Sequence, residues 1–242
     1  MSQGSSAAPT AYSDVQAAAY DDKRFSGPVG GRLHAFDWRI LRQALPSADH
    51  SARVLEVGCG TGRLLLEARQ AGYNVVGLDA SPHMLQQLSQ KIGGRGEPFE
   101  MIVGEAARIP RPDGSFDFVS AIRLLNQTES PEYALSVVAE MHRLTSPGGY
   151  LLAEFVNAHG PRWRDNRRDT TRLTPPQVIE RVRDAGGTVV HCRGAFYLGM
   201  QAYQASPAWC LRLVSALDRA ASRLLPRWCS RCFVLFRRKP AA

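Results

Sequence analysis

The sequence predicts a single α/β domain in which helices cover both faces of a mainly parallel sheet. Two observations predict this fold class. From residue 53 onward, short apolar segments with strand character alternate with segments of helical period. These strands are apolar on both faces, as strands of a helix-covered parallel sheet are. The length of 242 residues suits one such domain with an appendage.

Composition excludes several other classes of protein. Hydrophobic residues make up 44% and charged residues 21%, which is typical of a globular chain and excludes disordered and collagen-like sequences. No run approaches the roughly 18 apolar residues of a spanning helix, and residues 1–19 have neither a basic start nor an apolar run. We therefore expect no membrane span and no signal peptide.

Charge and cysteine content bear on partners and compartment. The net charge of +8 permits anionic partners but says nothing about fold. The odd count of five cysteines favours a reducing compartment, so a cytoplasmic location is expected. The oligomeric state stays open.

The chain begins with two segments that precede the main domain. Residues 1–19 are small and polar with no apolar period, which predicts a flexible tail. Region 20–50 is expected to hold an entry helix, because apolar residues recur at helical spacing from Leu33 until Pro46. The remaining residues, 51–242, are expected to form the main domain.

Within the main domain, apolar period and turn residues predict each element in order. The first five strands are expected at 54–57, 74–78, 99–103, 116–121 and 150–155, and the first three helices at 64–71, 84–92 and 133–144. Pro147-Gly148-Gly149 is expected to form the turn before the fifth strand. A helix at 175–184 and strands near 189–195 and 232–236 complete the domain. Residues 196–230 are too long for a hairpin, so they are expected to form a helical lid.

A glycine-rich turn follows the first strand and predicts a nucleotide-type ligand. Gly58, Gly60 and Gly62 allow a sharp turn and leave room for a ligand to lie on main-chain atoms. Asp79 stands at the end of the second strand, where its carboxylate can accept hydrogen bonds from two ribose hydroxyls. A nucleoside-containing cofactor is therefore expected.

The glycine spacing distinguishes between cofactor families. Dinucleotide-binding enzymes use Gly-x-Gly-x-x-Gly, whereas here the third glycine comes one position earlier. With Glu56 and Thr61, the turn resembles the first motif of class I S-adenosylmethionine-dependent methyltransferases, and Asp79 matches their second motif. Residues 104–117 and the passage from Glu140 to Gly149 are similar to later regions of that family. The resemblance covers about residues 53–155 and is closest to the branch of ubiquinone and menaquinone methyltransferases.

The resemblance implies a Rossmann-like, mostly parallel seven-stranded methyltransferase sheet with S-adenosyl-L-methionine as cofactor. The residues that it implies for cofactor binding are Glu56, Gly58, Gly60, Thr61, Gly62, Asp79, Ala80, Glu105, Ala106, Ala121 and Ile122. Two positions depart from the branch. Residue 105 is Glu where Asp is usual, and Asn126-Gln127 stand where a histidine is common.

The expected chemistry needs few protein groups. A sulfonium methyl group is already activated, so positioning the acceptor supplies most of the acceleration, and a base is needed only when the acceptor must lose a proton. His159, just beyond the fifth strand, is the candidate base. Arg123, Tyr197, Tyr203 and Trp209 are the candidate acceptor contacts, and the apolar lid suggests an aromatic or prenylated acceptor.

Several alternatives stay open at this level. The expected function is methyl transfer to an O, N or C atom of a small organic molecule. An RNA methyltransferase using the loop Arg162–Arg172, and a SAM-binding module without catalysis, are the alternatives. The fourth strand lacks the Pro-Pro-aromatic signature of base methylation, so nucleic acid is not the expected partner.

Two further features each have two readings. The apolar stripe at 211–225 favours a lid on the site over a membrane-surface helix. No metal is expected, because Cys192, Cys210, Cys229 and Cys232 are spaced like core cysteines rather than zinc ligands.

Overall fold

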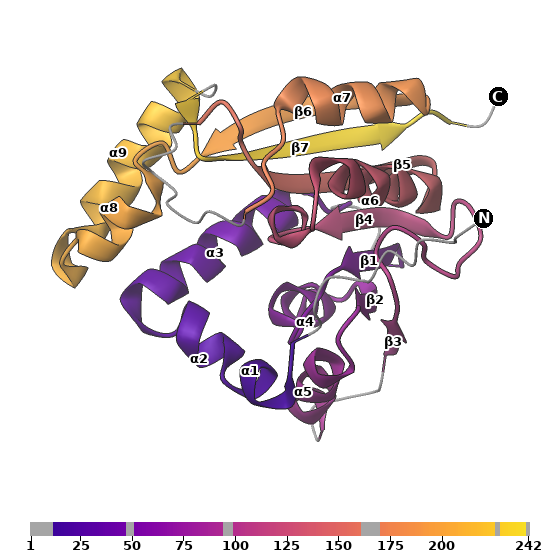
Figure 1. Cartoon of the computed structure of the whole chain (residues 1–242), viewed down its shortest axis with the longest axis horizontal. Coiled ribbons are helices and arrows are strands. Elements are labelled where there is room, and N and C mark those ends of the chain that lie inside the picture. Colours follow the sequence, from indigo (N-terminus) through magenta and orange to yellow (C-terminus); the bar gives the residue numbers. More distant parts are fainter. Residues whose placement is uncertain (1–11, 47–50, 94–98, 161–169, 226–227, 241–242) are drawn as a thin grey trace, which may run out of the picture.

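The computed structural model describes residues 12–46, 51–93, 99–160, 170–225 and 228–240. The described residues form one seven-stranded sheet in the order β3-β2-β1-β4-β5-β7-β6 (Figure 1). The strands are β1 (Arg53–Val57), β2 (Asn74–Asp79), β3 (Glu100–Val103), β4 (Phe116–Ala121), β5 (Thr145–Val156), β6 (Gly187–Ala195) and β7 (Arg231–Arg238). The first five pair in parallel, and β7 is antiparallel to both β5 and β6. The expected mostly parallel, seven-stranded methyltransferase-type sheet is confirmed.

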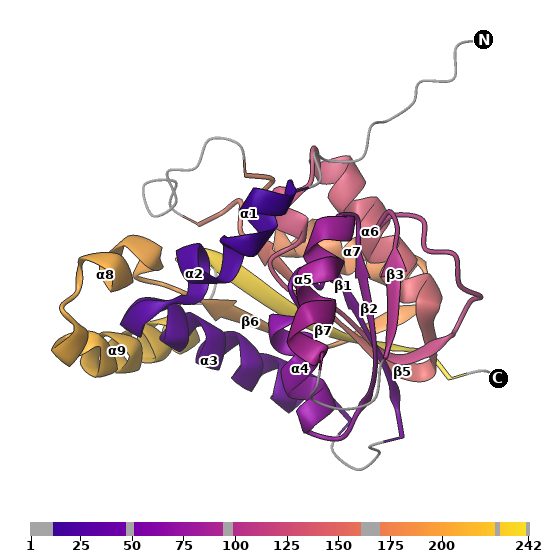
Figure 2. The same cartoon turned by 90° about the horizontal axis from the view of Figure 1, so that it is seen from below.

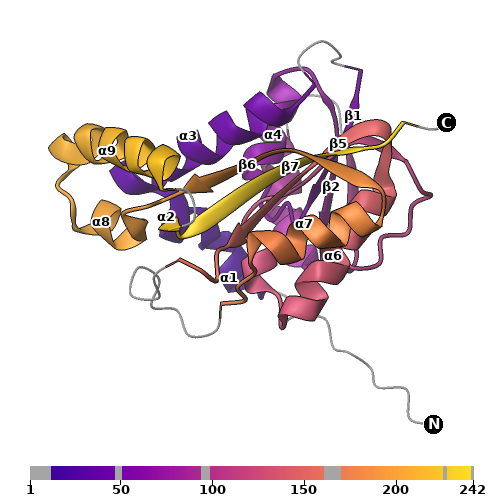
Figure 3. The ribbon, with the colours of Figure 1, turned by 90° about the horizontal axis from the view of Figure 1, so that it is seen from above.

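Helices cover both faces of the sheet. One face packs against α6 (Pro131–Leu144) and α7 (Pro175–Asp184), and the other against α3 (Gly27–Ala44), α4 (Arg63–Gln70) and α5 (Pro82–Ile92). Figure 3 shows α6 and α7 on one side of the sheet and α3 and α4 on the other. Alternate residues of each strand enter the two cores, as Phe118 and Val119 of β4 do.

Three of these helices begin at the same local signal. A hydroxyl side chain precedes a proline, accepts a hydrogen bond from the backbone N–H three residues on, and so caps the helix, while the proline starts it. The three pairs are Ser81-Pro82, Ser130-Pro131 and Thr174-Pro175.

The remaining helices gather beyond the carboxyl ends of the parallel strands. They are α1 (Asp14–Ala18) and α2 (Tyr20–Phe25) before α3, and α8 (Gly199–Ala205) and α9 (Leu211–Leu224) between β6 and β7. Figures 1 and 2 both show α8 and α9 projecting past the end of the sheet. None of the described helices is long and apolar enough to cross a membrane.

The amino-terminal region differs from expectation. Residues 14–18, predicted as part of a flexible tail, form α1, which Ser13 and Gln16 cap reciprocally and which buries Ala17. The segment is held by caps and polar contacts, which apolar periodicity does not detect. Residues 1–11 lie outside the described residues, and so does most of the arginine-rich loop 162–172.

Two elements of the main domain also differ from expectation. Strand β5 begins at Thr145, so Pro147-Gly148-Gly149 lies inside it at an irregular register between Phe116 and Phe118 of β4. Helix α9 is present, but only Leu211 and Val214 of its apolar residues pack on the protein, while Leu213, Leu217 and Leu224 are exposed. Its buried face consists of Leu211, Ser215, Asp218 and Ser222. The role of residues 196–230 as a lid over the site stays a prediction.

Candidate functional site

The glycine turn after β1 has one open position and two crowded ones. All three glycines have positive φ, +71° at Gly58, +55° at Gly60 and +79° at Gly62. A Cβ at Gly58 would lie 2.8 Å from Leu124 Cδ1, and one at Gly62 would lie 2.2 Å from Leu88 Cδ1. Nothing lies within 4 Å of a Cβ at Gly60. Gly58 and Gly62 are thus required by packing, while Gly60 faces space that a ligand can fill.

Asp79, the last residue of β2, holds this turn in place. Its Oδ2 accepts a hydrogen bond from Gly60 N at 2.8 Å, and its Oδ1 accepts one from Ser81 N at 2.9 Å. Burial raises the pKa of Asp79, and the backbone donors of Ser81 and Gly60 oppose that rise. A carboxylate has about four acceptor positions, so Asp79 retains capacity for further donors such as ribose hydroxyls.

Glu56, two residues before the turn, is a buried acid with an unsatisfied oxygen. Its Oε2 has no hydrogen-bond partner among the described residues. Burial raises the pKa of Glu56 to about 8, so the carboxyl is mostly protonated at neutral pH. An unpaired buried polar atom is costly, and a donor or acceptor from a bound molecule would satisfy it.

The other predicted cofactor residues lie at the neighbouring strand ends. Glu105 follows β3, and its carboxylate lies near the Tyr133 hydroxyl of α6. Burial, together with Glu105, raises the pKa of Tyr133 to about 12. Ala121 and Ile122 are buried at the end of β4. Because β1 to β4 are parallel neighbours, the structure brings the predicted residues to one edge of the sheet.

The amino-terminal helices close over the glycine turn. The sequence did not predict this contact. Thr61 Oγ1 donates to Asp21 Oδ1 at 2.7 Å, and Lys91 Nζ both pairs with Asp21 and donates to Thr61 O at 2.8 Å. Ser81 Oγ donates to the backbone oxygen of Tyr12 at 3.0 Å. These contacts are polar and join residues far apart in the sequence, so no periodic apolar pattern predicts them.

Beside the turn lies a buried cluster of charges, the arginine–carboxylate cluster of Asp37, Arg63, Arg123, Glu154 and Arg231. Asp37 of α3 accepts from Arg63 Nη2 at 2.9 Å and from Arg123 Nε at 2.7 Å. Glu154 of β5 accepts from the Arg123 backbone N–H at 2.6 Å and pairs with Arg231. The Phe25 ring packs 4.0 Å from the Arg63 guanidinium carbon. Three guanidiniums face two carboxylates, so the cluster has one positive charge in excess.

Arg123, a predicted acceptor contact, has an unusual backbone. Its φ is +63°, a region that side chains other than glycine rarely adopt. The Glu154 contact to its N–H and the two-point pair with Asp37 hold it there. Strained residues held by their surroundings cluster at binding sites.

The remaining acceptor candidates are scattered. Tyr203 is buried and donates to Asp218 Oδ2 at 3.1 Å. It lines a cavity of about 120 Å³ between α3, α8 and α9. The other lining residues are Arg32, Leu33, Ala35, Phe36, Arg39, Phe196, Ser215 and Arg219. Tyr197 is half-buried, and Trp209 is 84% exposed, so the structure does not bring Trp209 into this region.

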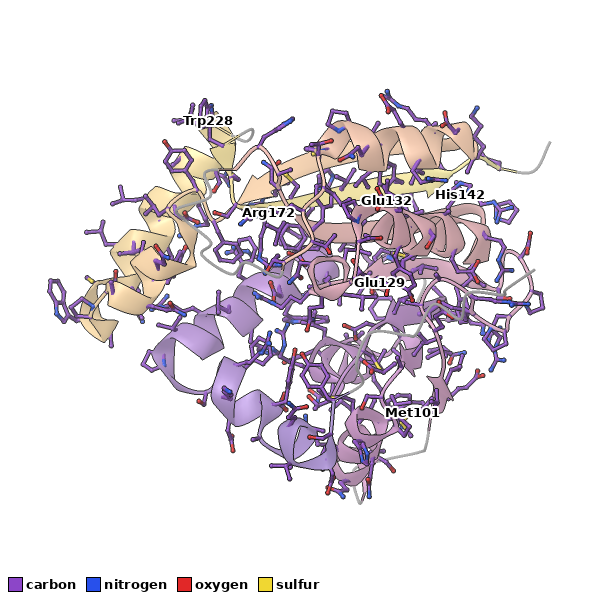
Figure 4. The ribbon with its side chains drawn as sticks, in the orientation of Figure 1. Met101, Glu129, Glu132, His142, Arg172 and Trp228 are labelled. Atoms are coloured by element: carbon purple, nitrogen blue, oxygen red, sulfur yellow. The ribbon has the colours of Figure 1, made fainter. Side chains whose placement is uncertain are left out.

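The histidines and cysteines are placed as follows. His159, the candidate base, is exposed in the turn after β5, where its N–H donates to Asn157 Oδ1 at 3.1 Å. His142 is buried at the end of α6, and Figure 4 shows it at the opposite end of the sheet from Trp228. Cys229 and Cys232 are buried but Cys192 is exposed, unlike the core position expected for it. Over the described ranges, no group of three or more His, Cys, Asp or Glu could hold a metal ion.

Comparison with known proteins identifies the family. A family model described as a methyltransferase domain matches residues 55–153, from β1 to β5. The demethylmenaquinone methyltransferase of Geobacillus kaustophilus is 37% identical over 136 residues, 54% of this chain and 56% of that protein. These matches support a class I S-adenosylmethionine-dependent methyltransferase domain at residues 55–153. It spans about half the length of the curated relatives that it matches.

Solved structures share the fold across most of this chain. Magnesium protoporphyrin IX methyltransferase from Synechocystis with bound SAH has a TM-score of 0.56 at 17% identity, covering 85% of this chain and 80% of that one. The [4+2]-cyclase SpnF has a TM-score of 0.62 at 20% identity, covering 85% and 81%. Since a cyclase has the same fold, the fold alone does not decide the reaction.

The residues present fit the cofactor of this methyltransferase family. The open space at Gly60 lies beside a carboxylate with spare acceptor capacity, and the unsatisfied Glu56 oxygen lies on the strand that leads into the turn. A nucleoside with a polar tail has donors for both acids. The third glycine comes one position earlier than in dinucleotide-binding turns, which argues against a dinucleotide.

Proposed function

We propose that this chain transfers a methyl group from S-adenosyl-L-methionine to an O, N or C atom of a small organic acceptor. The observation that carries the proposal is the space at Gly60 next to Asp79, at the carboxyl end of the first two strands. In open α/β sheets, ligands bind in this crevice. The match to a methyltransferase domain model supports methyl transfer rather than hydride transfer.

The chain's own residues would bind and orient. Asp79 would accept the ribose hydroxyls while keeping its bonds to the turn, and Glu105 would accept from the adenine amino group. Gly58 to Gly62, with Ala80, Ala106, Ala121 and Ile122, would provide main-chain and apolar contacts. The bound cofactor supplies an activated sulfonium methyl group. Thr61, through Asp21, would keep the amino-terminal helices closed and water out.

Charge and aromatic rings near the site narrow the chemical class of the methyl acceptor. The excess positive charge of the arginine–carboxylate cluster favours an acceptor with an acidic group or a developing oxyanion. The cavity lined by Phe36, Phe196 and Tyr203 favours an aromatic part. The name of the Geobacillus relative gives demethylmenaquinone as the first acceptor to test.

Two further proposals concern a catalytic base and the cellular location. His159 would act as a base only if the acceptor loses a proton, and its exposed turn allows it to move toward a bound acceptor. A cytoplasmic location would keep the free cysteines reduced. The RNA alternative depends on a loop that lies mostly outside the described residues, so no contact favours it.

Methyl-labelled cofactor, incubated with the protein and a bacterial metabolite and lipid extract, tests the proposal. We expect label in a small molecule, loss of labelling in Asp79→Ala, and full labelling in the control Asp184→Ala, which changes an exposed residue of α7. Label recovered in added bulk RNA instead would favour the RNA alternative. Cofactor binding with no labelled product from any extract would contradict methyl transfer.

A further inference from the structure

Helix α9 presents its apolar side chains to solvent. Leu213 is 61% exposed, Leu217 56% and Leu224 80%. With Ala220, they recur at intervals of four, three and four residues, which places them on one face of the helix. We call Leu213, Leu217, Ala220 and Leu224 the outer stripe.

The orientation of the helix is fixed from its opposite, polar face. Asp218 accepts from the Leu198 backbone N–H at 2.7 Å and from the Tyr203 hydroxyl at 3.1 Å. Ser222 Oγ accepts from the Tyr197 backbone N–H at 3.4 Å. Turning the outer stripe inward would break these bonds and leave Asp218 exposed. The usual arrangement of a surface helix, apolar inside and polar outside, is therefore reversed.

Tryptophans flank the outer stripe at both ends. Trp209 precedes α9 in a short 3-10 helix (Ala208–Cys210) and is 84% exposed. Trp228 follows α9 and is 57% exposed, and Figure 4 shows it at the end of α9 that adjoins β7. Exposed indole rings are favoured where an apolar medium meets water.

The rim of the helix is basic. Arg212, Arg219 and Arg223 lie together along one flank of the outer stripe. Asp218, which is buried and bonded, is the one acidic residue between positions 196 and 230. Arg193 and Arg39 lie close enough to Arg219 and Arg223 that, after burial, these neighbouring guanidiniums lower their pKa values. The charge around the outer stripe is thus positive with little compensation.

We propose that α9 lies on the surface of a membrane that contains anionic lipid, with the outer stripe and the two tryptophans in the interface. The helix has 14 residues, and a spanning helix needs about 20, so it would lie in the plane of the surface. A basic rim matches the negative surface of anionic lipids. A second copy of this chain is disfavoured as the occupant, because pairing two such helices would bring the arginine rows together.

Docking through α9 would give a lipid-soluble molecule in the bilayer a short path to the glycine-turn edge of the sheet. Helices α8 and α9 follow β6, whose carboxyl end lies at the same edge of the sheet as the glycine turn. Docking through α9 would hold that edge against the bilayer. The surface proposal does not depend on methyl transfer, since it concerns binding to vesicles in the absence of cofactor.

Vesicle co-sedimentation of the whole chain tests the surface proposal. We expect binding to vesicles of phosphatidylcholine and phosphatidylglycerol in equal parts, weak binding to phosphatidylcholine alone, and weakening of the former by salt. Tryptophan emission should shift to shorter wavelength on binding. The double variant Leu213→Ser, Leu217→Ser should bind at least tenfold more weakly, and Arg212→Gln, Arg223→Gln should lose the preference for anionic vesicles.

Val103→Ser is the matched control, because Val103 is 57% exposed on β3, at the opposite edge of the sheet. It should bind like the unchanged chain, and all variants should melt alike because the changed side chains are exposed. Equal vesicle binding by the serine double variant and the unchanged chain would overturn the proposal. A dimer in solution that this double variant abolishes, without any vesicle binding, would overturn it in favour of a second copy.

Discussion

Asp37 and Arg123 form a two-point ion pair between the entry helix α3 and the end of β4, although 86 residues separate them in sequence. Arg123 Nε lies 2.7 Å from Asp37 Oδ2, and Nη2 lies 3.3 Å from Oδ1. The pair joins a helix outside the family match to the strand ends that form the site. The entry helix is thus part of the site's structure.

Asp37→Asn should destabilise the protein by roughly 3–5 kcal/mol at pH 7, because it leaves buried guanidiniums of Arg63 and Arg123 without their carboxylate. Burial opposes the charged form of Asp37, but Arg123 and Arg63 outweigh it and lower its pKa. Since the folded pKa is the lower one, this stabilisation is present above the unfolded value of about 4 and is lost as pH falls through the folded value. Urea unfolding at several pH values should show the difference between variant and unchanged chain shrinking in acid.

Gly60→Ala should impair cofactor binding more than folding. Its methyl group meets no protein atom, so the fold loses about 1–2 kcal/mol through the positive φ alone, while the methyl fills the proposed ligand space. Gly62→Ala, whose Cβ would meet Leu88, should unfold more readily instead. Thermal melting and calorimetry with S-adenosylhomocysteine compare the two. Tight binding by folded Gly60→Ala would place the ligand elsewhere.

Glu56→Gln should stabilise the free protein at alkaline pH. The folded pKa of Glu56, about 8, exceeds the unfolded value, so the folded state holds an extra proton between about 4.5 and 8. The unchanged chain therefore loses stability as pH rises through that window, and the glutamine variant avoids this loss. Denaturant unfolding at pH 5 and pH 9 measures the free energy of unfolding of both proteins. An equal difference between the two proteins at both pH values would contradict the prediction.

Asp21→Ala should weaken cofactor binding roughly fivefold by opening the amino-terminal helices, since one hydroxyl bond and one half-exposed ion pair contribute about 1 kcal/mol together. Asp22→Ala changes the exposed neighbouring carboxylate and serves as control. Stopped-flow dissociation of S-adenosylhomocysteine should be faster in Asp21→Ala only. Identical rates in both variants would show that the contact does not close the site.

The cofactor half of the fold could be predicted because its signals are local. The strand that leads to Gly58 and the position of Asp79 after β2 each reflect a constraint within a few residues. The Ser-Pro starts of α5 and α6 are equally local, but they lie two residues before the predicted helices at 84–92 and 133–144. The contacts of Asp21 with Thr61 and of Asp37 with Arg123 are polar and long-range, so no periodicity reveals them.

Helix α9 shows a different limit of sequence reasoning. Its apolar period is visible in the sequence, but the period alone does not tell which face of a surface helix is buried. The partners of Asp218 decide the orientation, and Leu198 and Tyr203 can be identified only in three dimensions.

Isothermal calorimetry with S-adenosylmethionine, S-adenosylhomocysteine and NAD tests the central claim most directly, because the claim concerns what binds at the turn between β1 and α4. The account predicts binding of the first two at micromolar dissociation constants, no detectable binding of NAD, and a loss of about 1.5–3 kcal/mol in Asp79→Ala. NAD binding comparable to that of S-adenosylmethionine, or unchanged affinity in Asp79→Ala, would contradict it.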